Sequence, residues 1–362
     1  MKRRTFLKTT VGAGFVGSLA PNLLLGAAKD KPNEKLNIGI IGSGGRGSAN
    51  MRGVASENIV ALCDVNGQTL AASQKKYPKA KAYFDWRKLL EDKSIDAVTV
   101  STADHCHALA AVAAMRAGKH VYCEKPLAHS VHEARVMRET FAKSKVATQM
   151  GTQIHATDNY RRVVELVQSG AIGPVREAHV WCSRTINPIG APVLERQSPP
   201  DWFHWDEWQG PAPDRYHNQG YWKGGNLNWN RRWDYGNGVL GDMGSHLIDL
   251  PWWALELKTP LTCEAHGPKA DAVACPPWMR VTWEHAARKG RAALEVPVKV
   301  VWYHGGRSKR DRPAIETGMD LGKWGNGILF VGDKGMLLAD YGKRFLLPKE
   351  KFAGHKAPKP WI

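Results

Sequence analysis

Residues 36 to about 155 alternate short apolar segments with longer helical ones, and this alternation constrains the fold more than any other feature. The segments LNIGIIG, NIVALCDV, AVTVST, HVYCEKP and VATQMGT are typical of buried strands, and helical stretches such as HALAAVAAMRAG separate them. Parallel strands need a crossover between them, which a helix usually supplies. We therefore predict an α/β domain over residues 36–155, built on a doubly wound parallel sheet.

A glycine-rich turn follows the first of these strands. Gly42, Gly44 and Gly47 fit the pattern G-x-G-x-x-G and open a helix. The first glycine permits a tight turn, the second lets a pyrophosphate approach the backbone, and the third allows close packing of helix on strand. Asp64 ends the next strand, where an acid binds the adenosine ribose. This context predicts a Rossmann dinucleotide site rather than a merely structural turn. Asp64 favours NAD, while Arg46 leaves NADP open.

The segment YCEKPLA places a lysine where another strand ends. Lys125 is expected at the carboxyl edge of the sheet, where open α/β sheets bind ligands. A charged lysine there can hold a substrate hydroxyl and stabilise the alkoxide that develops as hydride leaves. Glu124 is expected to position it, and the bond before Pro126 is a candidate cis peptide. The alternative is a Lys-Pro turn on the surface with no catalytic role.

The segment GDMGSHLIDL contains an acid and a histidine four residues apart. A helix would place Asp242 and His246 on one face. Histidine is a natural base near neutral pH, and an adjacent carboxylate can fix its tautomer and raise its basicity. The alternative is that His246 caps a helix or packs in a domain interface. We predict no metal site, because neither this pair nor DHCH at residues 104–107 has a convincing third ligand.

Three of these features together resemble a known family. The glycine turn, the segment TADHCHALAAVAAMRAGKHVYCEKPLA and the segment GDMGSHLIDL are similar to those of the Gfo/Idh/MocA oxidoreductases, which include glucose–fructose oxidoreductase and inositol dehydrogenase. The resemblance covers Leu36 to about Tyr341. It implies that Lys125, Asp242 and His246 act on a sugar or cyclitol hydroxyl. The cofactor contacts that it and the glycine motif imply are Gly42, Ser43, Gly44, Gly45, Arg46, Gly47, Asp64, Thr102, His105, His107, Glu124, Lys125 and Pro126.

The resemblance also implies a second domain. Strand-like segments such as RAALEVPVKVVWYHG, GNGILFVGD and GMLLADYG follow in the last part of the chain. We expect an α+β domain at residues 156–350 with a largely antiparallel open sheet. Such sheets often mediate association in this family, which implies a homodimer or homotetramer. Family members usually continue with a further helix, so we expect a chain that is truncated or different at its C-terminus.

Within the second domain lies an insert rich in tryptophan, at residues 188–235. Eight of the fifteen tryptophans of the chain lie between Trp202 and Trp253. Indole faces suit the C–H faces of sugar rings, so loop tryptophans are candidates for substrate binding. The predicted substrate contacts are Lys125, Trp229, Arg231, Arg232, Trp233 and His246. Core packing is the alternative, and it is at least as plausible for Trp252 and Trp253.

The first 30 residues are typical of an export signal. Arg3 and Arg4 form a charged head, an apolar middle follows, and Gly26, Ala27 and Ala28 supply a cleavage site. The pattern resembles a twin-arginine signal, whose receptor exports folded proteins. The alternatives are an unprocessed basic tail or a lipid-facing anchor. We expect a periplasmic or extracytoplasmic protein that meets this export receptor.

Charge and cysteines add two expectations. The formal net charge is +17, but the basic residues are dispersed, so we expect no nucleic-acid partner. The six cysteines show no CxxC pair, and folding in the reducing cytoplasm before export would leave them as free thiols.

Three functions remain open at this point. An exported enzyme cannot exchange its spent cofactor, so we expect NAD or NADP to stay bound throughout. The leading prediction is a sugar or cyclitol oxidoreductase that balances its redox chemistry on the enzyme. The second is a glycoside hydrolase that takes a hydride from the sugar and later returns it. The third is a carbohydrate-binding protein without catalysis.

Overall fold

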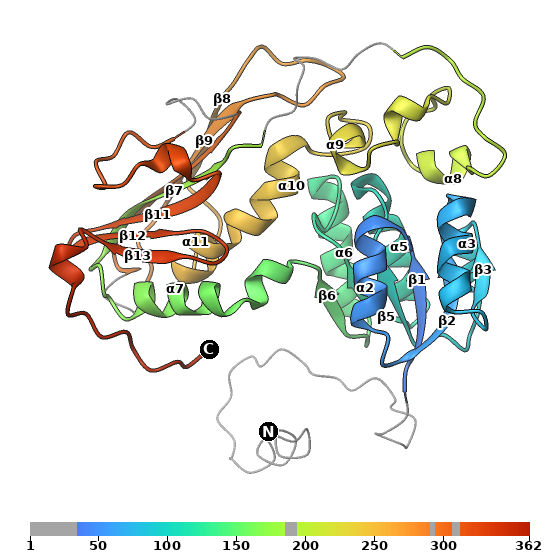
Figure 1. The fold of residues 1–362 in the computed structure, drawn as a ribbon, viewed down its shortest axis with the longest axis horizontal. Coiled ribbons are helices and arrows are strands. Elements are labelled where there is room, and N and C mark those ends of the chain that lie inside the picture. The colour runs from blue at the N-terminus through green and yellow to red at the C-terminus, as the bar shows by residue number, and fades with distance from the viewer. Residues whose placement is uncertain (1–34, 185–193, 290–293, 306–311) are drawn as a thin grey trace.

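The computed structural model describes residues 35–184, 194–289, 294–305 and 312–362, which form two sheets that lie side by side (Figure 1). The predicted export signal lies outside the described residues, as does the beginning of the tryptophan-rich insert. Among the described helices, none is long and apolar enough to cross a membrane. All six cysteines are free thiols, as expected, and five of them are buried.

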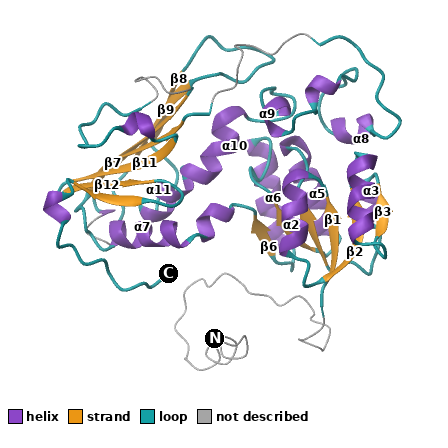
Figure 2. Cartoon of the chain, viewed as in Figure 1, coloured by secondary structure: helices purple, strands orange, loops and turns teal. Residues whose placement is uncertain are grey.

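The first domain is a parallel six-stranded sheet in the order β3-β2-β1-β4-β5-β6. Helices cover both of its faces, which confirms the predicted Rossmann arrangement (Figure 2). Two of its elements, β3 and α4, are not among those predicted above. The elements are β1 (Asn37–Ile41), α2 (Gly45–Gly53), β2 (Asn58–Cys63), α3 (Gly67–Lys76), β3 (Lys81–Tyr83), α4 (Trp86–Leu90), β4 (Ala97–Val100), α5 (Asp104–Arg116), β5 (His120–Cys123), α6 (Val131–Lys143) and β6 (Thr148–Met150).

Two kinds of side chain stabilise this domain. Aliphatic residues of the strands, such as Ile40 and Val100, are fully buried between the helical layers. Helix α5 is rich in alanine, and Ala110, Ala111 and Ala114 have no exposed surface. Small side chains let a helix approach its neighbours closely, and α5 packs against β4, β5 and α6. Because α5 follows the end of β4, its first turn lies at the carboxyl edge of the sheet.

The second domain is a seven-stranded sheet in the order β13-β12-β11-β7-β10-β9-β8. Only β7 and β10 pair in parallel, so the predicted largely antiparallel sheet is confirmed. Helices α7, α10 and α11 pack against it through a shared apolar core. The elements are α7 (Asp158–Gln168), β7 (Val175–Cys182), α8 (Trp205–Gln209), α9 (Asn226–Trp229), α10 (Gly238–Leu247), α11 (Asp249–Ala254), β8 (Thr262–His266), β9 (Met279–His285), β10 (Val298–His304), β11 (Asn326–Gly332), β12 (Gly335–Ala339) and β13 (Arg344–Leu347).

The insert leaves the second domain and crosses the carboxyl end of the Rossmann sheet (Figure 1). Its described part holds only short helices, including α8 and α9, and no strand. Phe203, Trp205, Tyr221 and Tyr235 form a buried aromatic cluster there, with further tryptophans around it. Burying so much aromatic surface lets a segment of little regular structure keep a defined shape. The insert and α10 together cover the edge of the sheet where the predicted cofactor site lies.

Candidate functional site

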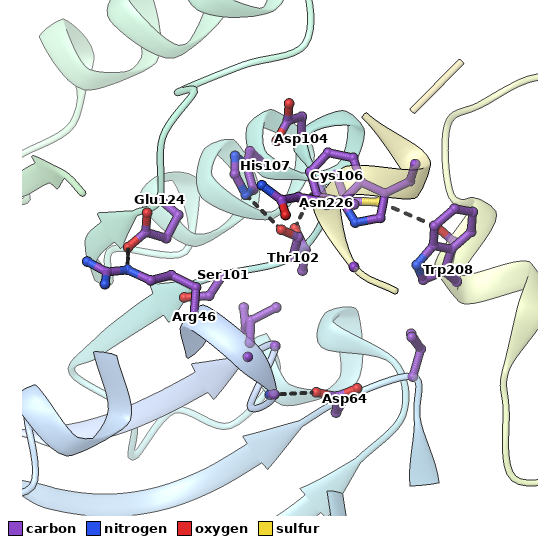
Figure 3. Close-up of a pocket in the computed structure, with 18 of the residues that line it drawn as sticks. Arg46, Asp64, Ser101, Thr102, Asp104, Cys106, His107, Glu124, Trp208 and Asn226 are labelled. Carbon is purple, nitrogen blue, oxygen red and sulfur yellow. Dashed lines mark hydrogen bonds and ion pairs between the residues drawn. The ribbon is translucent and has the colours of Figure 1, made fainter. Parts of the chain in front are cut away.

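A cavity of about 550 Å³ lies between the carboxyl edge of the Rossmann sheet, α10 and the insert. Figure 3 shows its walls, with Asp64 at one end and Glu124 and Arg46 at another. The structure brings most of the predicted site residues into these walls. They are Gly42, Gly44, Gly45, Arg46, Asp64, Thr102, His107, Glu124, Lys125, Trp229, Asp242 and His246.

The glycine turn has the shape that a pyrophosphate needs. Gly42 has a φ of 81°, and a Cβ on Gly47 would lie 1.8 Å from the carbonyl oxygen of Gly42. Among the described atoms, none lies within 4 Å of a Cβ built on Gly45, where α2 begins. The turn is therefore closed on the protein side and open on the other, in front of the first N–H groups of a helix. These residues fit a dinucleotide.

Asp64 braces the glycine turn. Its carboxylate accepts hydrogen bonds from the backbone N–H of Ser43 at 2.8 Å, of Gly44 at 3.2 Å and of Asn66 at 2.9 Å. Burial raises the pKa of Asp64, and these three hydrogen bonds oppose the rise. Asp64 thus holds the turn at the position where an acid contacts the ribose of a dinucleotide. Ser43 does not line the cavity and serves the site by donating to Asp64 from both its backbone N–H and its hydroxyl.

Lys125 meets Asp242 across the two domains. Its Nζ lies 2.5 Å from Oδ1 and 3.0 Å from the carbonyl oxygen of Asp242. Arg184, two residues beyond the end of β7, pairs with the other carboxylate oxygen of Asp242. The side chains of Lys125 and Asp242 are only 14% and 6% exposed, so water screens this pair weakly. The second domain therefore fixes the ammonium group of the first.

His246 lies on the same face of α10 as Asp242, as predicted, and lines the same cavity. The expectation that Asp242 orients the imidazole is wrong. The carboxylate is engaged by Lys125 and Arg184, and Nδ1 of His246 has no hydrogen-bond partner among the described residues. Burial and, to a smaller extent, the nearby Lys125 lower the pKa of His246 to about 4, while Asp242 opposes this shift. The ring is neutral at pH 7.

Glu124 connects the glycine turn with the lysine. It accepts hydrogen bonds from Arg46 Nε at 3.0 Å, from Asn50 Nδ2 at 2.9 Å and from the backbone N–H of Lys125 at 3.2 Å. Glu124 is 3% exposed and thus anchors Lys125 through the backbone. The bond between Lys125 and Pro126 is cis, as the sequence suggested. Arg46 is engaged at this side of the cavity, away from Asp64 (Figure 3).

The two histidines at the start of α5 hold neighbouring segments in place. The ring nitrogens of His107 lie 2.7 Å from the carbonyl oxygen of Pro126 and 3.1 Å from that of Thr102. His107 thus connects the turn of Lys125 with the end of β4. His105 was predicted to contact the cofactor, but it does not line the cavity. Its ring nitrogens lie 2.9 Å from the carbonyl oxygen of Trp208 and 3.2 Å from that of Tyr235, so it anchors the insert to α5.

The structure divides the predicted substrate contacts. Trp229 lines the cavity together with Lys125 and His246. Three others, Arg231, Arg232 and Trp233, lie outside its walls. Arg231 donates to Asn228, Arg232 is buried with its guanidinium 4.9 Å from the ring of Tyr221, and Trp233 donates to the carbonyl oxygen of Asp271. Those three side chains shape the insert, since consecutive residues of a turn cannot all face one cavity.

Sequence reasoning missed several residues of the site. Arg184 pairs with Asp242, and Asn226 lies within 3.5 Å of the same carboxylate. Asp104, in the first turn of α5, lines the cavity and is 3% exposed. A position just beyond a strand was the only signal for Arg184. Within the described residues, no group of three or more His, Cys, Asp or Glu side chains could hold a metal ion.

Two family matches cover most of the described chain. Residues 36–152 match an oxidoreductase family with an NAD-binding Rossmann fold, and residues 159–291 match the C-terminal alpha/beta domain of that family. The chain is 35% identical over 150 residues to an inositol 2-dehydrogenase from Salmonella typhimurium, which covers 40% of this chain and 45% of the relative. It is 24% identical over 229 residues to a levoglucosan dehydrogenase from Pseudarthrobacter phenanthrenivorans, which covers 60% of this chain and 50% of the relative.

The chain thus spans about half the length of the curated relatives it matches. A solved structure with a similar fold is the WlbA dehydrogenase from Bordetella pertussis in complex with NADH and UDP-GlcNAcA. Its TM-score is 0.60 at 16% identity, and the match covers 86% of this chain and 80% of that one. This likeness shows the shared fold and agrees with the two sheets described above.

Proposed function

The chain belongs to the Gfo/Idh/MocA oxidoreductase family, and on this premise we propose that it oxidises a hydroxyl group of a sugar or cyclitol with NAD or NADP. One observation carries the proposal. Lys125 and His246 come from different domains, yet both line the cavity that contains the open glycine turn. A hydroxyl held there would have a cation and a neutral base beside it, at the edge of the sheet where a dinucleotide binds.

Each of these residues has a distinct task. The ammonium of Lys125 would donate a hydrogen bond to the reacting oxygen and stabilise the negative charge that develops on it. A ring nitrogen of His246 would take the hydroxyl proton, which requires the neutral imidazole that burial maintains. A bound nicotinamide supplies the hydride acceptor. Asp242 acts as a positioning residue, because it holds Lys125 and, among the described residues, accepts no hydrogen bond from Nδ1 of the imidazole.

We further propose that the protein is exported with its cofactor bound. Two features support this: the twin-arginine-like pattern of residues 1–30, and an insert that covers the carboxyl edge of the sheet. Outside the cytoplasm a released nucleotide could not be replaced. The reaction would then have to be balanced on the enzyme, with a second substrate that takes the hydride back.

The test starts with protein purified from its host without added nucleotide. Denaturation should release NAD or NADP, and a panel of free sugars and inositols should give a keto product, with or without a second sugar as acceptor. Lys125→Ala should lower kcat by at least roughly 10²-fold and retain the nucleotide. The control is Lys145→Ala, since Lys145 is exposed near the start of β6, at the opposite edge of the sheet.

Two results would contradict the proposal. The first is unchanged turnover in Lys125→Ala, which would remove this lysine from the reaction. The second is release of the aglycone from aryl glycosides with no net oxidation, which would identify a hydrolase instead.

A further inference from the structure

We infer that the insert forms a wall of the site for the adenosine half of the dinucleotide. The inference rests on the proposed function, because it presupposes a bound dinucleotide. It differs from the expectation that the loop tryptophans hold a sugar. Several residues of the insert line the cavity, among them Phe203, Glu207, Trp208 and Trp222.

The insert is hydrogen-bonded to the loop that follows β2. The backbone N–H of Gly67 donates to the carbonyl oxygen of Trp202 at 2.7 Å, and that of His204 donates to Val65 at 2.9 Å. Asn66 and Phe203 form an antiparallel bridge between these contacts. Val65 and Asn66 directly follow Asp64, and all three line the cavity. In a Rossmann domain this is the edge that receives the adenosine ribose.

The walls at this edge are suited to an adenine ring. Phe84 and Trp86 line it from the Rossmann domain, and Phe203 and Trp222 line it from the insert. Flat aromatic faces bind a nucleobase by stacking. Lys125 follows β5, which β1 and β4 separate from β2, and His246 lies near Lys125, so the place for a reacting hydroxyl is away from Asp64. The aromatic residues around Asp64 are therefore available to the nucleotide rather than to the sugar.

The aromatic wall is held in place before any ligand arrives. Phe203 and Trp222 stack with ring centroids 4.0 Å apart, and His204 stacks on Phe84 at 3.8 Å. Trp222 also donates from Nε1 to His217 at 3.0 Å. A preorganised wall loses little conformational entropy on binding, which favours slow release of the ligand. A cofactor that cannot be replaced outside the cytoplasm has to be released slowly.

The charges of this edge favour NAD over NADP. Glu207 from α8 lines the cavity together with Asp64, and both carboxylates lie near the thiol of Cys63. Arg87 lies near Glu207, and it is already paired with Asp85. Arg46, the candidate partner for a 2′-phosphate, is engaged by Glu124 elsewhere in the cavity. Within the described parts of the chain, neither Asp64 nor Glu207 forms an ion pair, and two such carboxylates would repel a 2′-phosphate.

The experiment measures how fast the full-length holoprotein exchanges bound nucleotide against excess labelled NAD. Trp222→Leu should raise the release rate roughly 5- to 100-fold, because it removes one stacking face. The control is Trp361→Leu, since Trp361 is 49% exposed near the C-terminus and outside the cavity walls. It should leave the rate within about twofold, the range expected for a surface substitution. Glu207→Gln should raise the affinity for NADP relative to NAD roughly tenfold.

The outcomes separate the two proposals. If wild-type protein holds neither NAD nor NADP, the proposed function fails, and this inference fails with it. If wild-type protein holds NAD and Trp222→Leu releases it no faster than Trp361→Leu, only the adenosine wall is refuted. Should Trp222→Leu fail to fold by circular dichroism, Glu207→Gln decides the matter, because it changes charge at nearly constant volume. An unchanged NADP-to-NAD ratio would then count against the inference.

Discussion

His105 gives the sharpest test of how the insert is held on the Rossmann domain. The ring is 1% exposed, and both of its nitrogens face carbonyl oxygens of the insert, those of Trp208 and Tyr235. Burial lowers the pKa of His105 to about 4, against an ordinary value of 6.5, and the two carbonyl contacts only partly oppose this. Folding therefore keeps the ring neutral. The stability that this provides is complete above pH 6.5 and is lost as the pH falls towards 4.

The size of the effect follows from the two pKa values. Linkage between a pKa of 6.5 in the unfolded chain and about 4 in the folded one gives a loss of about 2 kcal/mol between pH 7 and pH 5. The loss grows to about 3 kcal/mol at pH 4. His105→Gln keeps an amide that can donate to one carbonyl oxygen but cannot titrate. We expect this variant to be less stable at pH 7 and to lack the His105 part of the acid sensitivity.

The assay is urea unfolding at pH 7 and pH 5, followed by tryptophan fluorescence and circular dichroism. Coincident transitions would justify a two-state free energy. Between the two pH values, wild-type protein should lose about 2 kcal/mol more than His105→Gln. His132→Gln serves as the control, because His132 is exposed on α6. Equal losses in wild-type protein and His105→Gln would refute the view that a neutral His105 holds the insert.

Three further predictions concern the glycine turn, the carboxylate of Asp242 and the cysteine thiols. Gly47→Ala would place a methyl group 1.8 Å from the carbonyl oxygen of Gly42, so we expect loss of bound nucleotide and a lower melting temperature in a thermal scan. Asp242→Asn leaves Lys125 and Arg184 without the carboxylate between them, and it should cost about 3–5 kcal/mol by urea unfolding. Combining Asp242→Asn with Lys125→Met should recover part of that loss. If the losses of the two single variants simply added, the ion pair would not couple the two residues. Ellman's reagent should label Cys263 quickly in native protein and all six thiols after denaturation. Rapid labelling of several thiols in the native protein would contradict the burial of the other five.

Much of the fold and part of the site could be predicted from local patterns. Alternating apolar segments indicate parallel strands, and G-x-G-x-x-G followed by Asp64 indicates a dinucleotide turn, because spacing along the chain sets these features. The pair Asp242 and His246 does face one cavity, as four-residue spacing on a helix requires. The roles of residues 1–30, the domain limits and the site assignments remain predictions.

Tertiary contacts decided the rest. The sequence by itself determined the α/β order, the glycine turn and the presence of a lysine, an acid and a histidine. It could not show that Asp242 binds Lys125 and Arg184 instead of His246. Lys125 lies 117 residues away and meets Asp242 only when the two domains pack, and Arg184 lies 58 residues away and meets it only in the folded second domain. Nor could it show that the insert packs its aromatic rings beside Asp64, since stacking depends on the direction of side chains in a segment without a regular period. Local spacing encodes secondary structure, whereas the partner of a charged or aromatic group depends on what the completed fold brings within reach.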